Sequence, residues 1–330
     1  MSEARPATPL EIGVAAAVVT VERDTPMILV ARPGEEGVVG LPSGSFDPLS
    51  HRTLEIGLRA FVAEQTGLSL GYVEQLYTFG DRGRNARVGD AAPHVVSIGY
   101  LALTRHAVGS ALPKAARFRP WYAFFPWEDW RGGRPAILDS QIVPALDAWS
   151  ADRAAERAEG ARRAASRVQR VAQCFGAGSD GEGWDEEKVL ERYELLYEAG
   201  LVPEARRDGR EAALRREPLP GLGESMVFDH RRILATAMGR LRGKLKYRPV
   251  VFELLPPVFT LTALQRTVES ISGRHLHKQN FRRVVENAAL VEPTGETATT
   301  GGRPAALFRF RREVVEERPA PGLRLGARRA

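Results

Sequence analysis

Cysteine is almost absent from this 330-residue chain, which holds a single one, Cys174. One cysteine excludes an internal disulfide framework and any metal site built from several cysteine thiolates. No apolar run approaches the roughly 18 residues of a membrane-spanning helix. The first ten residues, MSEARPATPL, contain no apolar core of a secretory signal. We therefore expect a cytoplasmic protein that makes no contact with a membrane.

The charge of the chain is unevenly distributed. The composition, 43% hydrophobic and 27% charged, is that of a globular protein long enough for two domains. Residues 231–330 carry 20 Lys and Arg against 8 Asp and Glu, a net charge of +12, whereas residues 1–230 carry 27 against 33, a net charge of −6. A basic segment joined to an acidic one is typical of a nucleic-acid-binding module, although a solvated basic face has the same composition.

The first 150 residues predict a mixed α/β domain. An amphipathic helix is expected over 54–65, because its apolar residues recur with helical spacing. Runs rich in β-branched and apolar residues precede and follow it. These predicted strands cover residues 12–22, 27–33, 71–80 and 94–104.

Residues 151–225 differ in composition and are interpreted as an insert. We expect a solvated helix from Ala151 to Cys174, a flexible break over 176–183, and a poorly ordered loop over 203–223. A helix over 184–200 has Asp185 as its cap and one apolar face. That face either docks on the first domain, which we favour, or serves dimerisation. Its members are Val189, Tyr193, Leu196 and Tyr197.

The C-terminal module has the sharpest pattern, over residues 250–316. A connecting helix over 226–249 leads to it, and a basic, disordered tail, 317–330, follows it. Gly273 ends one of its helices and supplies a tight turn. Helix, helix, turn, helix and hairpin in this order predict a winged helix-turn-helix. The elements are a short helix at 250–257, helices over 262–272 and 277–290, and strands over 290–293 and 305–310.

The third helix of this module is expected to contact duplex DNA. Arginine and lysine suit guanine edges and phosphates, and glutamine suits adenine. The candidates are Lys278, Gln279, Arg282 and Arg283 on the third helix, Thr262 on the second, and Arg303 in the hairpin loop. A winged helix used for protein contacts alone is the alternative, and the +12 charge argues against it.

Residues 41–70, LPSGSFDPLSHRTLEIGLRAFVAEQTGLSL, resemble the Nudix signature. That family holds Mg²⁺ with helix carboxylates spaced so that they share one face. Aligned on Gly67, the signature's glutamates fall on Phe61, Glu64 and Gln65, so Glu64 is the one that remains. The sequence therefore predicts no catalytic site, no metal site and no cofactor, with Mg²⁺ required only if hydrolysis persists. A βαβ fragment without Nudix kinship is the alternative.

A ligand site without catalysis is still expected in this domain. Gly44 lies in the signature loop, Phe79 can stack on a base, and Arg82, Arg84 and Arg87 can hold phosphates. A solvated surface loop is the alternative reading of the arginines. The aromatic cluster over residues 121–130 is expected to pack in the core rather than to clamp a nucleotide.

Taken with the winged helix, the chain resembles the Nudix-related transcriptional regulators. The resemblance rests on FTLTALQRTVESISGRHLHKQNFRRVVENAALVEPTGE and GGRPAALFRF. It implies an α+β protein with a Nudix-like α/β/α sandwich, a mixed sheet, a helical insert and a C-terminal winged helix. It further implies a homodimeric repressor of NAD-metabolism or sugar-utilisation operons that binds palindromic operator DNA and senses ADP-ribose or a related sugar nucleotide. The alternatives are a Mg²⁺-dependent Nudix hydrolase with an accessory winged helix, and a structural adaptor.

Overall fold

The computed structural model describes most of the chain. The described residues are 10–31, 38–81, 94–105, 112–152, 166–176, 183–299, 304–314 and 323. Arg82, Arg84, Arg87 and Arg303 lie outside them, so their expected ligand and DNA contacts stay predictions. Within these ranges, no helix is long and apolar enough to cross a membrane.

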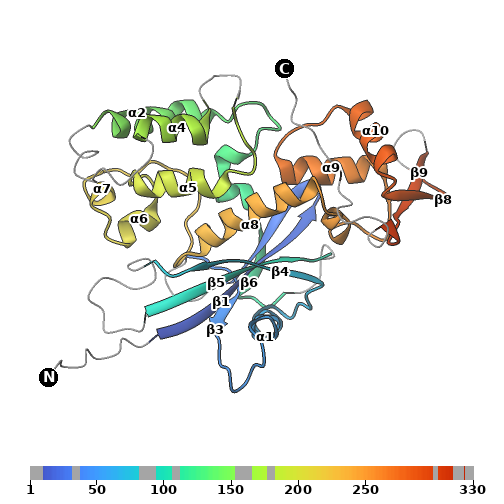
Figure 1. The fold of residues 1–330 in the computed structure, drawn as a ribbon, viewed down its shortest axis with the longest axis horizontal. Helices are drawn as coiled ribbons and strands as arrows, with labels where there is room; N and C mark the ends of the chain where they lie inside the picture. Colours follow the sequence, from blue (N-terminus) through green and yellow to red (C-terminus); the bar gives the residue numbers. More distant parts are fainter. Residues whose placement is uncertain are drawn as a thin grey trace.

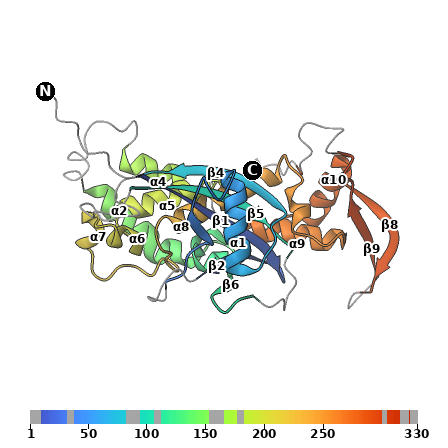
Figure 2. The ribbon, with the colours of Figure 1, turned by 90° about the horizontal axis from the view of Figure 1, so that it is seen from below.

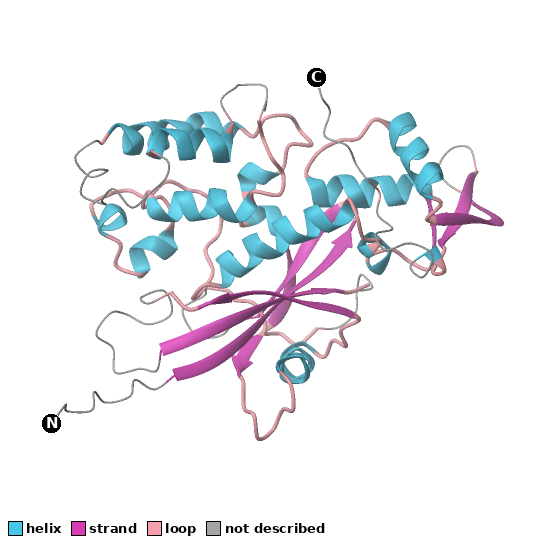
Figure 3. Ribbon diagram, viewed as in Figure 1, coloured by secondary structure: helices cyan, strands magenta, loops and turns pink. Residues whose placement is uncertain are grey.

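A mixed six-stranded sheet forms the centre of the first domain (Figure 3). Its order is β4-β5-β1-β2-β6, with β3 paired to β1; β1 and β5 run parallel and the other pairs antiparallel. The predicted strands and helix are confirmed to within a few residues. The elements are β1 (Leu10–Glu22), β2 (Thr25–Ala31), β3 (Ser43–Ser45), α1 (Leu54–Thr66), β4 (Tyr72–Phe79), β5 (His94–Leu103) and β6 (Ala116–Pro120).

Alternation along β1 divides the core into two layers. Val14, Ala16 and Val18 face α1, and Ala15, Ala17 and Val19 face the opposite side, because successive strand residues point to opposite faces. Both sets are almost wholly buried, as expected for a central strand covered on each side. Figures 1 and 2 show α1 on one face of the sheet and α8 (His230–Leu245) on the other.

The insert is folded more extensively than the sequence predicts. The expected solvated helix from Ala151 to Cys174 is confirmed only in its last part: a helix ends at Ala151, residues 153–165 lie outside the described ranges, and α4 begins at Arg167, which is 4% exposed. The expected loop over 203–223 is wrong, because it contains two short helices. A π-helical turn (Leu138–Ile142) and α2 (Val143–Ala151) lead into the insert, which contains α4 (Arg167–Phe175), α5 (Val189–Glu198), α6 (Pro203–Arg207) and α7 (Glu211–Leu214).

The apolar face of α5 packs against α8, and Tyr193 on this face also contacts the Phe125 ring of the first domain, the docking favoured from the sequence. Val189, Tyr193 and Leu196 are at most 2% exposed and belong to one core with residues of α8. Asp185 stands farther from the helix than predicted, because Lys188 precedes α5 and the Asp185 carboxylate accepts from the Glu187 amide. This core also includes residues of α9 (Leu261–Ser272), so the first domain, the insert and the C-terminal module share it.

The C-terminal module is the predicted winged helix. Thr260 caps α9 (Leu261–Ser272) through the Ala263 amide, and Gly273, with a φ of 72°, ends it in the left-handed region that favours glycine. An additional short strand joins the hairpin, giving the order β7-β9-β8. The remaining elements are a 3-10 turn (Val250–Glu253), β7 (Val258–Thr260), α10 (Lys278–Ala288), β8 (Val291–Ala298) and β9 (Ala305–Phe310).

Candidate nucleic-acid interface and ligand cavity

The basic residues of α10 lie on its solvent-exposed side. Phe281 and Val285 are at most 1% exposed and anchor the helix to the core, as predicted. Lys278, Gln279, Arg282 and Arg283 fall on the remaining faces and are all exposed. The helix therefore presents four polar or cationic side chains at the end of the molecule farthest from the insert (Figure 1).

These exposed side chains have few internal partners. Arg283 donates to the Asn280 side-chain oxygen at 3.0 Å, across one turn of α10. Lys278 and Arg282 make no hydrogen bond or ion pair within the described part of the chain. Thr262 is also exposed, in the first turn of α9. Cations without internal partners keep their donors available for phosphates and base edges.

Arginines elsewhere in the chain are buried and fully engaged. The Glu128 carboxylate forms ion pairs with Arg192 Nε at 2.6 Å and with Arg242 Nη1 at 2.7 Å. All three side chains are 0% exposed. Burial alone would raise the pKa of Glu128, but the two guanidinium groups outweigh it and hold that pKa below its ordinary value. Glu128, Arg192 and Arg242 come from the first domain, the insert and α8, so this cluster joins three segments.

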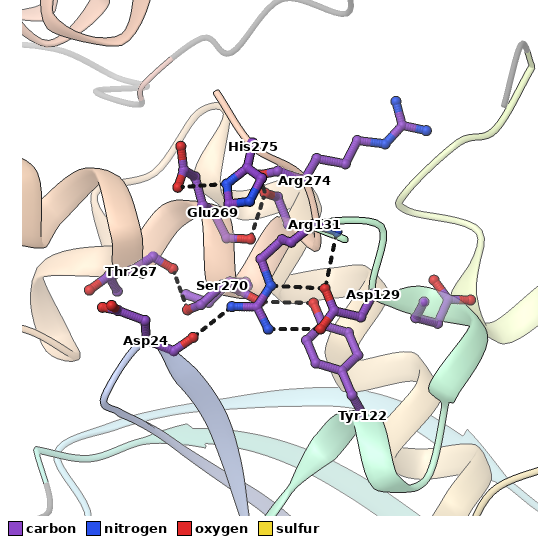
Figure 4. Close-up of polar contacts among 12 residues, drawn as sticks. Asp24, Tyr122, Asp129, Arg131, Thr267, Glu269, Ser270, Arg274 and His275 are labelled. Atoms are coloured by element: carbon purple, nitrogen blue, oxygen red, sulfur yellow. Dashed lines mark hydrogen bonds and ion pairs between the residues drawn. The ribbon is translucent and has the colours of Figure 1, made fainter. Parts of the chain in front are cut away.

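Further contacts join the first domain to the end of α9, and we call them the domain seam (Figure 4). Tyr122 Oη donates to the Ser270 carbonyl at 2.8 Å, and Arg242 Nε donates to the Ile271 carbonyl at 2.9 Å. A Cβ on Gly273 would lie 2.4 Å from the Glu128 carbonyl, so only glycine fits this approach. The domain seam is defined as Tyr122, Glu128, Arg242, Ser270, Ile271 and Gly273.

A pair of aspartates extends these contacts toward the β1–β2 turn. Arg131 donates to both Asp129 carboxylate oxygens at 2.8 Å and to the Asp24 carbonyl at 2.6 Å (Figure 4). Arg266, on α9, forms an ion pair with the Asp24 carboxylate at 3.4 Å, although both side chains are at least half exposed. The winged helix is thus held against the first domain by buried hydrogen bonds and, less strongly, by exposed charge.

The Nudix-like helix carries an aromatic ring where the signature places a carboxylate. The Phe61 ring lies against Gly44, since a Cβ there would fall 2.7 Å from it. Gln65 is hydrogen-bonded to both the amide and the carbonyl of Ser43, at 3.2 and 2.6 Å. Glu64 is exposed. Among the described residues, no group of three His, Cys, Asp or Glu side chains could hold a metal ion.

Phe79 does not present its ring to a ligand. Its side chain is 1% exposed, and the Arg232 guanidinium lies 4.8 Å from the ring centroid. The expectation that Phe79 stacks on a base is therefore wrong: the end of β4 turns this ring into the core beneath α8. The aromatic residues over 121–127 are buried as predicted.

A cavity of about 170 Å³ opens beside Gly44. It lies between the starts of β1 and β5, strand β3 and the start of α8, and sequence reasoning missed it. Phe228 and His230 also line it, although about 180 residues separate them in the sequence from the lining residues of β3. Phe228 is 48% exposed and has a φ of 48°, unusual for a non-glycine residue and a mark of functional sites.

A larger groove of about 420 Å³ lies between the start of α5 and α8. Its carboxylate Glu187 is already paired with Lys246 at 2.6 Å. The groove also lies away from Gly44 and from the Nudix-like helix. The smaller cavity is therefore the better ligand site, because it is next to the signature loop and holds unpaired polar groups.

Comparison with known proteins identifies the C-terminal module. Residues 251–310 match the NrtR DNA-binding winged helix domain. The "ADPR responsive transcriptional repressor NtrR" of Acinetobacter baylyi is 42% identical over 85 residues, which are 26% of this chain. The match covers 34% of that relative's length, about a third.

Two solved structures of Shewanella oneidensis NrtR share the whole architecture. One, complexed with a 27mer DNA, has a TM-score of 0.53 at 20% identity and covers 92% of this chain and 95% of that one. The other has a TM-score of 0.52 with the same identity and coverage. This chain combines a Nudix-like domain with an NrtR-type winged helix. At this identity the likeness establishes the fold.

Within the NrtR-type winged helix, α10 is the second helix of the helix-turn-helix, the one that enters the major groove in this class of domain. Its exposed side chains are therefore on the element expected to read DNA. The domain seam holds the preceding helix, α9, so any shift of the Nudix-like domain would move α10 with it.

Proposed function

We propose that this chain is a ligand-responsive transcriptional repressor. It binds operator DNA through the NrtR-type winged helix and senses ADP-ribose or a related sugar nucleotide in the Nudix-like domain. The observation that carries the proposal is the exposed basic face of α10, on which Lys278 and Arg282 have no partner among the described residues, within a module matching a DNA-binding domain. The name of the Acinetobacter baylyi relative supports ADP-ribose as the effector.

We further propose that the protein acts as a homodimer in the cytoplasm. A two-fold symmetric protein binds palindromic sites, with one winged helix on each half-site. Effector binding in the Nudix-like domains would change the spacing of the two winged helices across the domain seams and release the operator. NAD-metabolism or sugar-utilisation genes are the proposed targets.

DNA binding is tested by selecting duplexes from a random-sequence library with the full chain. The proposal predicts enrichment of a palindromic motif. It also predicts that Arg282→Ala weakens binding to that duplex, whereas Arg215→Ala, at the end of the distant helix α7, does not. Recovery of a library without any sequence preference would overturn the proposal of an operator-specific repressor.

The Nudix-like domain is proposed to bind nucleotide without hydrolysing it. Phe61 and Gln65 replace two of the carboxylates that would hold Mg²⁺, and the exposed Glu64 alone offers too little charge. Excess Mg²⁺ and ADP-ribose should yield no AMP above the protein-free control. Product formation that is lost in Glu64→Gln would instead establish a Mg²⁺-dependent hydrolase.

A further inference from the structure

The cavity beside Gly44 is too small for a whole dinucleotide. Its volume of about 170 Å³ falls below the roughly 300–1,000 Å³ of sites that enclose a complete small molecule. It therefore accommodates one group of a ligand. Glu11, Gly13 and Ala15 line it and alternate along β1 onto the face of Ala15, which is covered by α8, and Val14, whose side chain faces α1, also lines it.

One wall of this cavity is a fixed hydrogen-bond donor. His230 is 5% exposed, and its Nδ1 accepts from the Leu41 amide at 2.9 Å. The proton of the neutral ring must then be on Nε2. Burial and the nearby Arg207 lower the pKa of His230 to about 4, so the ring is neutral at physiological pH. Nε2–H has no partner among the residues the structure describes.

The start of β1 offers this cavity a hydrogen-bond acceptor. The Glu11 carboxylate lines the cavity and accepts a hydrogen bond from Ser45 Oγ on Oε1. Its second oxygen, Oε2, has no partner within the described ranges. None of the described lining residues is Lys or Arg. A carboxylate in the lining repels a phosphate, so the phosphates of a nucleotide would lie outside this cavity.

The exposed ring of Phe228 provides an aromatic surface at this site. Arg207 holds its backbone in place by donating to the Met226 and Phe228 carbonyls at 2.7 and 2.9 Å. Glu204 accepts from the Met226 amide at 3.0 Å. Glu204 and Arg207 are both on α6, so the insert fixes the segment that carries Phe228. Aromatic side chains held in this way stack well on nucleobases.

We infer that this cavity binds the adenine base of the effector. The base stacks on Phe228, a ring nitrogen accepts from His230 Nε2–H, and the exocyclic amine donates to Glu11. The inference rests on the proposed function for its choice of ligand. It places base recognition beside the signature loop, between the start of β1 and a segment before α8 that the insert supports.

The base contacts are tested by calorimetric titration of the full chain with AMP, IMP and ribose 5-phosphate. AMP should bind more tightly than IMP, since IMP carries an oxygen in place of the amine, and ribose 5-phosphate should not compete. Phe228→Leu, which keeps the apolar bulk, should weaken AMP binding about tenfold. Glu11→Gln should reduce or reverse the preference for AMP over IMP, because an amide can donate to the IMP oxygen.

A matched pair of variants separates binding from folding at His230. His230→Asn retains an acceptor for the Leu41 amide but removes the donor from the cavity, and should weaken AMP binding about tenfold. His230→Gln can retain the cavity donor and should bind AMP more tightly than His230→Asn. Unchanged DNA affinity in each variant would show that the fold is intact.

The results distinguish this inference from the proposed function. Equal AMP affinity in wild type, Phe228→Leu and His230→Asn would overturn the base site, as would equal AMP and IMP affinities insensitive to Glu11→Gln. Failure of AMP to bind, while ADP-ribose still releases DNA, would overturn the base site alone. AMP binding that follows the expected pattern, with DNA affinity insensitive to ADP-ribose, would refute the effector role and leave the base site standing.

Discussion

Arginine serves opposite purposes in the interior of this protein and on α10. Arg192, Arg231 and Arg242 are at most 1% exposed, and each is held by a carboxylate and by backbone carbonyls. Arg282 and Arg283 are exposed. Arg283 makes one hydrogen bond, to Asn280, and Arg282 makes none with the described residues. Residue type and net charge do not separate these two groups. The difference is whether the guanidinium donors are already satisfied.

This difference assigns distinct roles to the two regions. A buried ion pair contributes to a unique arrangement, and removing one partner leaves an uncompensated charge in the interior. An exposed cation contributes little to folding and retains its donors for a ligand. Substitutions at the domain seam should therefore affect stability, and those on α10 should affect DNA binding alone.

The largest expected effect is on the buried cluster. Glu128→Gln removes the charge that neutralises Arg192 and Arg242, and should lower the free energy of unfolding by about 3–5 kcal/mol. Glu211→Gln is the matched control, because its ion pair with Arg215 is about three-quarters exposed, and should change stability by less than about 0.5 kcal/mol. Urea unfolding measures both. Similar urea midpoints for Glu128→Gln and Glu211→Gln would contradict the expected difference between buried and exposed ion pairs.

Acid should destabilise the protein through His230. The folded-state pKa of about 4 lies below the ordinary value of 6.5, so the unfolded chain binds more protons between these values. Stability is therefore lost as pH falls through 6.5 toward 4. Between pH 7.5 and pH 5 the loss from this residue should be about 2 kcal/mol. Urea unfolding at the two pH values should show this loss in wild type and a smaller one in His230→Asn.

A single contact on α10 should have a smaller effect, confined to DNA binding. Arg282→Ala should weaken binding to a selected duplex about tenfold, equivalent to about 1.4 kcal/mol. If Arg282 contacts a phosphate, the slope of log affinity against log salt should also fall by about one. Its unfolding midpoint should match wild type. Destabilisation comparable to Glu128→Gln would place Arg282 in the structural group instead.

Periodicity and turn chemistry made the winged helix predictable. The spacing of Leu264, Val268 and Ile271, followed by Gly273, defines a helix and its end from neighbouring residues alone. The central strands and α1 were found for the same reason. The candidate DNA-contacting residues on α10 were found by excluding the residues of its apolar face, and the structure shows that they are exposed.

Long-range contacts explain what sequence reasoning missed. Helix α6 has five residues, and the partner of its Glu204 is Arg231, on α8. The hydrogen bond that fixes His230 beside the cavity joins it to Leu41 across 189 positions, so no local pattern indicates the cavity. Phe79 was misassigned because strand alternation does not reveal that α8 covers its end. Such features depend on tertiary packing, which propensity and spacing do not encode.

The most direct test of the account is the affinity of the full chain for its selected duplex as ADP-ribose is added. Fluorescence anisotropy of the labelled duplex reports that affinity, and calorimetry on the same samples reports occupancy by ADP-ribose. The account predicts that saturating ADP-ribose weakens DNA binding by between about 5-fold and 150-fold, the usual range of coupling between two sites. Unchanged DNA affinity at full ADP-ribose occupancy would contradict it.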